Sequence, residues 1–302
     1  MKVLLTGSTG QLGQAIIESK PKRIDLISTN RHNLNLKNPK ECFKIIEKIK
    51  PEWVINSGAY TNVDKAETEE ELTFKINYKA PEAIAYALKK YGGKLIQIST
   101  DYVFNGEKSS EYKINDIQSP INIYGKSKYL AEKTITDILQ EKNQLMIIRT
   151  SWLISPVGKN FLLTILNLLK NGKNINVVND QIGAITSTFS LSSVIWKLIE
   201  KNNNYSFKNK EFPKFFHWSD KGNLTWYDLA LAIRKISKEI GIIENSGEIN
   251  PISTEEYKYN AKRPKYSVLN CEETEKILNT KAIEWEKSLL KILNHLSKNH
   301  QN

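Results

Sequence analysis

The sequence predicts an α/β fold, in which a doubly wound parallel sheet is followed by a smaller α/β lobe. Three observations lead to this prediction. Short apolar runs that suit buried strands alternate with amphipathic helical stretches through the first half of the chain. A glycine-rich turn directly follows the first strand. From Glu211 onward the pattern changes to short, mixed segments, which indicates a second lobe.

Composition limits the class of protein. A chain of 302 residues can bury a full core and holds one large or two modest domains. The net charge is +11, but the lysines are scattered. This pattern is typical of a solvated surface that attracts anionic ligands, so we expect no nucleic-acid partner. Cys42 and Cys271 lack metal-ligand spacing, which fits a reducing cytoplasm. No apolar run approaches the roughly 20 residues that span a bilayer, so we expect no membrane partner.

The first predicted elements are a strand over 2–6, a turn, and a helix over about 11–19. Gly7, Gly10 and Gly13 lie at three-residue spacing in the turn. Glycines allow a tight turn and a close approach of the backbone to a pyrophosphate, which sits at the helix N-terminus. The spacing differs from the Gly-x-Gly-x-x-Gly of many dehydrogenases. We nevertheless predict a dinucleotide-binding, Rossmann-type domain rather than a plain turn.

The second strand, over 23–28, bears on which dinucleotide is bound. An NAD site usually has an acidic residue at or just past the end of this strand. Residues 28–31 contain no acid, and Arg31 offers a positive charge to a 2′-phosphate. The sequence therefore favours NADPH, with NADH as the alternative. The competing interpretation of Arg31 is an exposed loop arginine that contacts no ligand.

The next elements bring polar residues to one edge of the sheet. A helix over 39–50 and a strand ending at Asn56 lead into Ala59, Tyr60 and Thr61, and a long helix from about 69 to 90 follows. The strand over 94–98 ends just before Thr100. Because ligands bind beyond the carboxyl ends of parallel strands, we expect residues 7–13, 59–61 and 100–102 to gather there.

Three side chains near that edge suit proton transfer. Tyr124 and Lys128 are four residues apart and share one face of a helix. A neighbouring ammonium favours the phenolate, so we expect Lys128 to lower the pKa of Tyr124. Thr100 offers a hydroxyl to the same space. This set predicts an acid–base centre acting on a carbonyl oxygen, the alternative being a surface tyrosine beside a solvated lysine.

The second half continues with a strand over 146–149, a helix over 160–171, a strand over 175–178 and a helix over 190–200. A strand follows at 215–218, then a helix from its N-cap Thr225 to about 240, and a closing helix over 284–296. His217 alternates with aromatic residues, so we interpret it as structural.

We predict that residues 1–150, with a returning segment near 175–205, form the dinucleotide-binding domain. Residues 151–174 and 206–302 then form the smaller, substrate-binding lobe.

Several motifs resemble the extended short-chain dehydrogenases and, more narrowly, the dTDP-4-dehydrorhamnose reductases. The similarity covers nearly the whole chain in the family's order. The segments that carry it are Thr6–Gly13, Gly58–Glu67, Ser99–Gly106, Tyr124–Lys128, Arg149–Trp152, Val178–Gly183 and Arg263–Asn270. One departure is Ile185, where the family usually has proline, which leaves the shape of that loop open.

The resemblance implies a cytoplasmic, NADPH-dependent reduction of the 4-keto group of dTDP-4-dehydro-L-rhamnose, a step in making cell-surface polysaccharide. It implies Tyr124 as general acid, with Lys128 and Thr100 as its catalytic partners. The implied substrate contacts are Thr100, Asp101, Tyr102, Trp152, Arg263 and Asn270. The implied cofactor contacts are Gly7, Gly10, Gln11, Leu12, Gly13, Asn30, Arg31, Asn35, Leu36, Ala59, Tyr60, Thr61, Ile98, Tyr124 and Lys128.

Two alternatives come from the same superfamily. The regulatory β subunit of methionine adenosyltransferase shares the fold without catalysis, although the intact Thr100, Tyr124 and Lys128 argue against that role. Epimerases and dehydratases retain NAD and are expected to carry the acid that the second strand lacks. Some relatives are dimers with a metal ion at the interface. Mg²⁺ is therefore an option, but we identify no ligand cluster for it, and the chain is expected to be a monomer or a homodimer.

Overall fold

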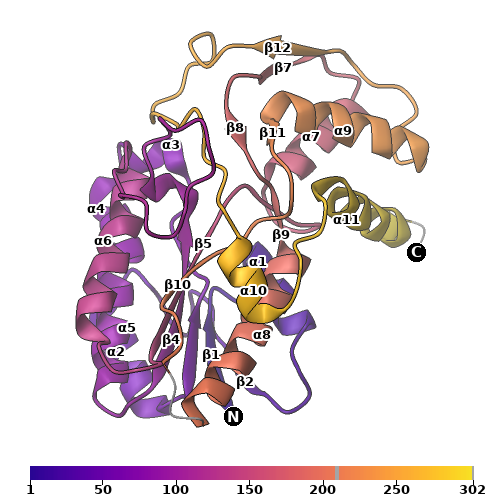
Figure 1. Ribbon diagram of the computed structural model, residues 1–302. Helices are drawn as coiled ribbons and strands as arrows, with labels where there is room; N and C mark the ends of the chain where they lie inside the picture. The colour runs from indigo at the N-terminus through magenta and orange to yellow at the C-terminus, as the bar shows by residue number, and fades with distance from the viewer. Residues whose placement is uncertain (208–210, 301–302) are drawn as a thin grey trace.

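A computed structural model describes residues 1–207 and 211–300, which form a larger and a smaller lobe (Figure 1). In these residues the larger lobe contains a six-stranded sheet whose strands all pair in parallel, in the order β10-β5-β4-β3-β1-β2. The predicted α/β class with a parallel sheet is confirmed. The strands are β1 (Lys2–Thr6), β2 (Asp25–Ser28), β3 (Trp53–Asn56), β4 (Lys94–Thr100), β5 (Leu145–Thr150) and β10 (Phe215–His217).

Helices cover both faces of this sheet. On one face lie α2 (Pro39–Ile49), α5 (Ala80–Lys89) and α6 (Ile123–Ile138), which bury an apolar core against β3, β4 and β5. On the other face lie α1 (Gln11–Glu18) and α8 (Thr188–Phe207). Since both faces are covered, the strands read as continuous apolar runs, and every residue of β5 is buried.

The strand order places a switch point at β1, which lies between β2 and β3. In doubly wound sheets a ligand crevice forms at the carboxyl ends of the strands at such a point. Short elements follow the strand ends at this edge: α3 (Val63–Ala66) and α4 (Glu70–Phe74) after β3, and a 3₁₀ turn at Asp101–Val103 after β4. The predicted helix over 69–90 is interrupted by a π-helical segment, Lys75–Lys79, between α4 and α5.

The smaller lobe surrounds a second core built on α7 (Phe161–Lys170), α9 (Trp226–Glu239) and α11 (Trp285–His300). Thr225 is the N-cap of α9, as predicted, and forms a capping box with Asp228. Ile185 is fully buried in this core, so the residue that replaces the family's proline serves packing. Paired short strands complete the lobe: β7 (Ile175–Val178) with β12 (Ile249–Ile252), β8 (Ile182–Gly183) with β11 (Leu224–Thr225), and β6 (Leu153–Ile154) with β9 (Thr186–Ser187).

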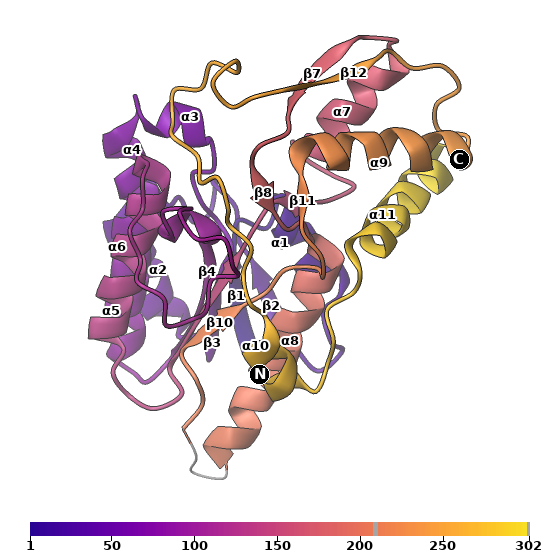
Figure 2. The ribbon, with the colours of Figure 1, turned by 45° about the horizontal axis from the view of Figure 1, so that its top comes forward.

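The chain crosses between the two lobes more times than the predicted domain boundaries imply. The strand at 175–178 was expected in the returning segment, but it pairs with β12 in the smaller lobe because β12 supplies its backbone partners. The strand at 215–218 was expected in the smaller lobe, but β10 pairs with β5 and forms one edge of the large sheet. Helix α10 (Glu272–Leu278) returns once more to pack on α8 and β10, as Figure 2 shows. No helix in the described part of the chain has the length and apolarity to cross a membrane.

Candidate active site

The glycine-rich turn after β1 is shaped for a close approach of backbone. Gly7 has φ +66°, and a Cβ there would lie 2.7 Å from the Cα of Gly58, so the loops after β1 and β3 touch through their glycines. A Cβ on Gly13 would lie 2.2 Å from the carbonyl oxygen of Gly7. Gly10 is the N-cap of α1 and has no side chain to cap its first N–H groups. The turn and the helix N-terminus therefore fit a pyrophosphate.

The other predicted cofactor contacts lie along the same edge of the sheet. Asn30 and Arg31 follow β2 in an exposed turn, and the backbone N–H of His32 donates to the side chain of Asn30. Leu36 reaches the Gly58 loop, where its Cδ1 would be 2.7 Å from a Cβ on that glycine. The structure thus gathers Gly7–Gly13, the loop after β2 and the loop after β3 at the switch point. The side chain of Gln11 hydrogen-bonds with the Lys159 carbonyl and the Asn160 side chain, just before α7.

Tyr60 is fixed by a residue that the sequence did not single out for function. Its backbone N–H donates to Oδ1 of Asn77 (2.8 Å), and its carbonyl accepts from Nδ2 of the same amide (3.0 Å). Nδ2 also donates to Ser127 Oγ, and Ser127 in turn donates to the carbonyl oxygen of Tyr124 (2.7 Å). Asn77 lies in the π-helical segment, and such segments are frequent at functional sites. It therefore joins the cofactor edge to the helix of the acid–base centre.

Thr100, Tyr124 and Lys128 converge at the end of β4. Thr100 donates to Oδ1 of Asp101 (3.0 Å) and lies within hydrogen-bonding range of the Tyr124 phenol. Lys128 is buried, and its Nζ donates to the carbonyl oxygen of Ile98 (2.5 Å). Helix α6 carries the side chains of Tyr124 and Lys128. Its N-cap is Asn122, whose side chain accepts a hydrogen bond from the N–H of Gly125.

The pKa of Tyr124 shifts in the opposite direction to our expectation. Burial is the main cause that raises it to about 12; the hydrogen bond with Thr100 lowers it, and the negative charge of Asp101 adds to the rise. Burial also lowers the pKa of Lys128 to about 8, partly offset by Glu132. The Nζ of Lys128 is directed at the backbone carbonyl of Ile98, and burial dominates the pKa of the phenol. Tyr124 is therefore fully protonated at neutral pH, which is the form that a general acid requires.

Two predicted substrate contacts surround the phenol. Burial raises the pKa of Asp101 to about 6, against hydrogen bonds from Ser267 and Thr100 that lower it. The rings of Tyr102 and Tyr124 meet edge to face at 5.9 Å. Asp101 and Tyr102 thus lie next to Thr100 and Tyr124.

Trp152 is a partly buried side chain of the smaller lobe. Its ring stacks on Trp226 with centroids 3.6 Å apart. It has φ +38°, a left-handed conformation that is uncommon for a bulky residue and that clusters at ligand sites.

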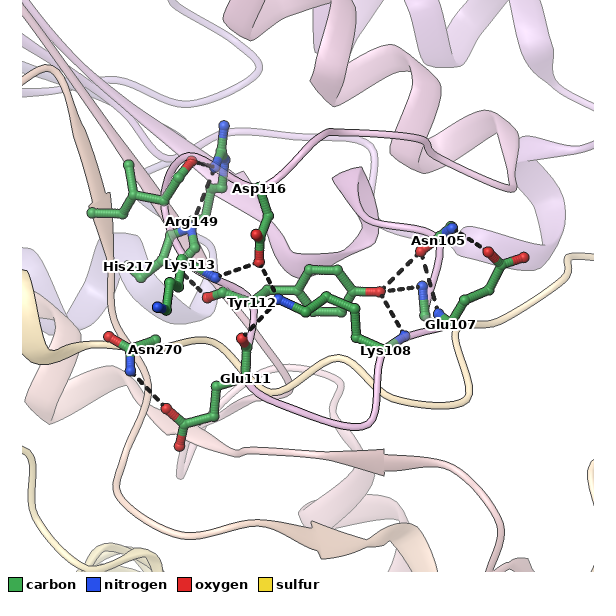
Figure 3. Close-up of polar contacts among 12 residues, drawn as sticks. Asn105, Glu107, Lys108, Glu111, Tyr112, Lys113, Asp116, Arg149, His217 and Asn270 are labelled. Carbon is green, nitrogen blue, oxygen red and sulfur yellow. Dashed lines mark hydrogen bonds and ion pairs between the residues drawn. The ribbon is translucent and has the colours of Figure 1, made fainter.

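Two further predicted substrate contacts are engaged with protein groups. Arg263 forms an ion pair with Asp64 (Nη2–Oδ2 2.8 Å). Asn270 donates to Oε2 of Glu111 at 2.8 Å, as Figure 3 shows.

A buried ionic cluster lies next to Lys128, on the interior side of the acid–base centre. Glu132, one helical turn after Lys128, accepts from Ser99 and from Nε and Nη2 of Arg149, and both charged side chains are almost fully buried. Arg149 also donates to the carbonyl oxygen of Ile114 and contacts His217 (Figure 3). Burial lowers the pKa of His217 to about 3. The neutral ring therefore accepts from Arg149 at Nε2 and donates from Nδ1 to the carbonyl oxygen of Tyr112, which supports its structural interpretation.

Among residues 1–207 and 211–300, no group of three or more His, Cys, Asp or Glu side chains is placed to hold a metal ion. The Mg²⁺ option therefore receives no support from this chain.

Known proteins resemble this chain over nearly its whole length. Residues 1–298 match the family described as the RmlD substrate binding domain. A dTDP-4-dehydrorhamnose reductase of Aggregatibacter actinomycetemcomitans is 32% identical, over 96% of this chain and 98% of that protein. A reductase of the same name from Clostridium acetobutylicum superposes with a TM-score of 0.88 at 35% identity, covering 98% of this chain and 100% of that one.

A further solved structure holds a nucleotide. The Bacillus anthracis dTDP-4-dehydrorhamnose reductase, in complex with NADP, has a TM-score of 0.87 at 32% identity, covering 97% of this chain and 99% of that one. A UDP-glucose 4-epimerase from Thermotoga maritima is only 16% identical at a TM-score of 0.81, a likeness of fold alone.

Proposed function

Because the chain belongs to the RmlD substrate binding domain family, we propose that it reduces the 4-keto group of dTDP-4-dehydro-L-rhamnose to give dTDP-L-rhamnose, with NADPH as reductant. The observation that carries the proposal is the convergence of Thr100, Tyr124 and Lys128 at the sheet edge that also holds the glycine-rich turn. A fold alone does not determine a reaction, but this arrangement of groups suits a carbonyl reduction.

The cofactor would be held by the turn Gly7–Gly13 and the loop 59–61, with Arg31 and the neighbouring Asn30 toward the 2′-phosphate and Asn35 and Leu36 beside them. Ile98 and Lys128 lie at the inner end of this edge. When bound, the reduced nicotinamide supplies the hydride that adds to the carbonyl carbon. The absence of an acid after β2 supports NADPH over NADH.

Tyr124 supplies the proton. The C4–O double bond becomes a C–O single bond as the carbon gains a hydride and the oxygen takes the phenol proton. Lys128 lies one helical turn from Tyr124, and its positive charge stabilises the phenolate that remains. Thr100 holds the reacting oxygen by a hydrogen bond, while Asp101 and Trp152 bind the sugar.

The substrate is a dTDP-sugar under this proposal, and the reaction takes place in the cytoplasm, a location supported by the two free cysteines. We propose a monomer or a homodimer, which the mass in solution would distinguish.

The test is oxidation of NADPH, followed at its absorbance band, with dTDP-4-dehydro-L-rhamnose made in situ from dTDP-glucose. Tyr124→Phe should lower kcat by roughly 10²–10⁴, the usual contribution of a positioned acid. Tyr86→Phe is a matched control, because Tyr86 is exposed on α5 and should retain full activity. Near-normal turnover by Tyr124→Phe would contradict the assignment.

A further inference from the structure

Residues 261–270 form a strap between the two lobes. In Figures 1 and 2 this segment descends from the β12 side of the molecule, passes α3 and reaches α10. The side chain of Asn122, the N-cap of α6, donates to its Lys262 carbonyl (2.8 Å). Farther along, its backbone bonds to the larger lobe at Gly106 and Tyr112 and to the smaller lobe at Ile182.

One ion pair fixes the start of the strap. Arg263 donates through Nη1 to Oδ1 of Asp64 (3.1 Å) and through Nη2 to Oδ2 (2.8 Å). Oδ1 also accepts from the backbone N–H of Ala261 (3.2 Å). The Arg263 side chain is only 14% exposed, and its guanidinium carbon lies 3.7 Å from the ring centroid of Tyr259. Such two-pronged pairs are stronger and more directional than single contacts.

The same neighbourhood holds the start of the catalytic helix. Asp64 belongs to α3, and Glu67 directly follows that helix. Oε1 of Glu67 accepts from the backbone N–H of Ile123, the first residue of α6 (2.8 Å). The Asp-Lys-Ala-Glu motif therefore binds the strap with its first residue and the catalytic helix with its last.

The strap also connects two sides of the substrate site. Ser267 lies beside Asp101, next to Thr100, and opposes the rise in the pKa of that carboxyl. The N–H of Ile182 donates to the Lys265 carbonyl, and the N–H of Ser267 donates to the Ile182 carbonyl, so the strap is bonded to β8. Gly183 of β8 abuts Trp152, because a Cβ there would lie 2.5 Å from the indole. A shift of the strap would therefore move Ser267 relative to Asp101 and, through β8, would also move the indole of Trp152.

We propose that Asp64 and Arg263 are positioning residues that hold the strap against α3, so that they determine the affinity for the nucleotide sugar without touching it. The inference rests on the proposed function and reassigns Arg263, which we expected to contact the sugar nucleotide directly. Both Nη atoms of Arg263 are directed at Asp64 and its guanidinium faces Tyr259, which favours the positioning role.

The test is a double-mutant cycle of Asp64→Asn and Arg263→Gln in the NADPH oxidation assay. Either change breaks the same pair, so each single variant and the double variant should raise KM for the dTDP-sugar by a similar factor of about ten. We expect kcat to stay within about twofold, because the Tyr124 centre is intact, and KM for NADPH to be unchanged. Asp64→Glu keeps the carboxylate and should recover part of the affinity.

The matched control is Glu200→Gln, which removes an exposed pair with Arg23 (3.1 Å, side chains 57% and 71% exposed) and should change neither constant. If Asp64→Asn leaves KM unchanged while Arg263→Gln raises it, Arg263 contacts the substrate directly and the proposal is wrong. Multiplying effects in the double variant, or a loss of kcat at constant KM, would also overturn it.

A second readout does not depend on turnover. Amide hydrogen exchange over residues 261–270 should accelerate in Asp64→Asn but not in Glu200→Gln. Unchanged exchange would refute the positioning role. If exchange accelerates in Asp64→Asn as expected but the wild-type enzyme does not oxidise NADPH with this substrate, only the proposed function is contradicted.

Discussion

Replacing Glu132 by glutamine should strongly destabilise the protein. Glu132 accepts from Nε of Arg149 at 3.1 Å, from its Nη2 at 2.8 Å and from Ser99 Oγ at 2.5 Å. The side chains of Glu132 and Arg149 are 3% and 1% exposed, so water cannot compensate the guanidinium once its partner is neutral. Breaking one partner of a buried pair typically costs about 3–5 kcal/mol.

That loss is large against the whole stability of a folded protein, which is about 5–15 kcal/mol. At about 2–4 °C per kcal/mol for a chain approaching this size, the midpoint of thermal unfolding should fall by roughly 6–20 °C. The assay is thermal unfolding followed by circular dichroism, with urea unfolding for the free energy. Glu200→Gln removes an exposed carboxylate and should change the unfolding free energy by less than about 1 kcal/mol.

A double variant separates the lost ion pair from lost packing. In Glu132→Leu/Arg149→Met both charges are gone, so much of the stability should return, because no buried charge remains unpaired. Wild-type stability of Glu132→Gln would refute this reasoning. So would a double variant that is less stable than Glu132→Gln.

Two further predictions concern a buried acid and the nucleotide turn. Burial raises the pKa of Asp220 in the folded protein to about 6 from 3.8, so the folded state holds this proton more tightly than the unfolded chain. The associated stability is present below pH 3.8 and is lost as the pH rises to about 6, which amounts to about 3 kcal/mol. Asp220→Asn should therefore be the more stable protein at pH 8 but not at pH 4 in urea titrations, and equal stability at both would count against it. Gly13→Ala places a Cβ 2.2 Å from the Gly7 carbonyl oxygen and should weaken NADPH binding at least tenfold in fluorescence titration, whereas Gly172→Ala, at an open surface position, should not.

The sequence predicts the strands of the large sheet and the convergence of their ends because these features follow from local pattern. Runs such as Leu145–Ile148 are apolar throughout, and glycine or hydroxyl residues follow them within a few positions. Which lobe a short strand joins is not a local property. Both Ile175–Val178 and Phe215–His217 are short β-prone runs, and only the partners β12 and β5 assign them to a lobe.

The residues that hold the site in place from outside it could not be recognised in the sequence for a similar reason. Asn77, Glu132 and Asp64 are single polar residues in or next to helical stretches, a pattern typical of a solvated face. Their burial and partners depend on elements distant in sequence, such as Arg263 for Asp64. Similarly, the four-residue spacing places Tyr124 and Lys128 on one helix but does not reveal that burial dominates the pKa of both.

The repeated passage of the chain between lobes has a consequence for synthesis on the ribosome. One face of the β1–β3 region is covered by α8 (Thr188–Phe207), and the β5 edge is completed by β10 (Phe215–His217). A nascent chain that ends near residue 150 therefore has five strands of the sheet but exposes an apolar face and an unpaired strand edge, features that promote aggregation. The sheet face should be covered by α8 and the β5 edge paired with β10 only after about 218 residues have emerged. A late segment, rather than the N-terminal half, therefore sets the order of folding.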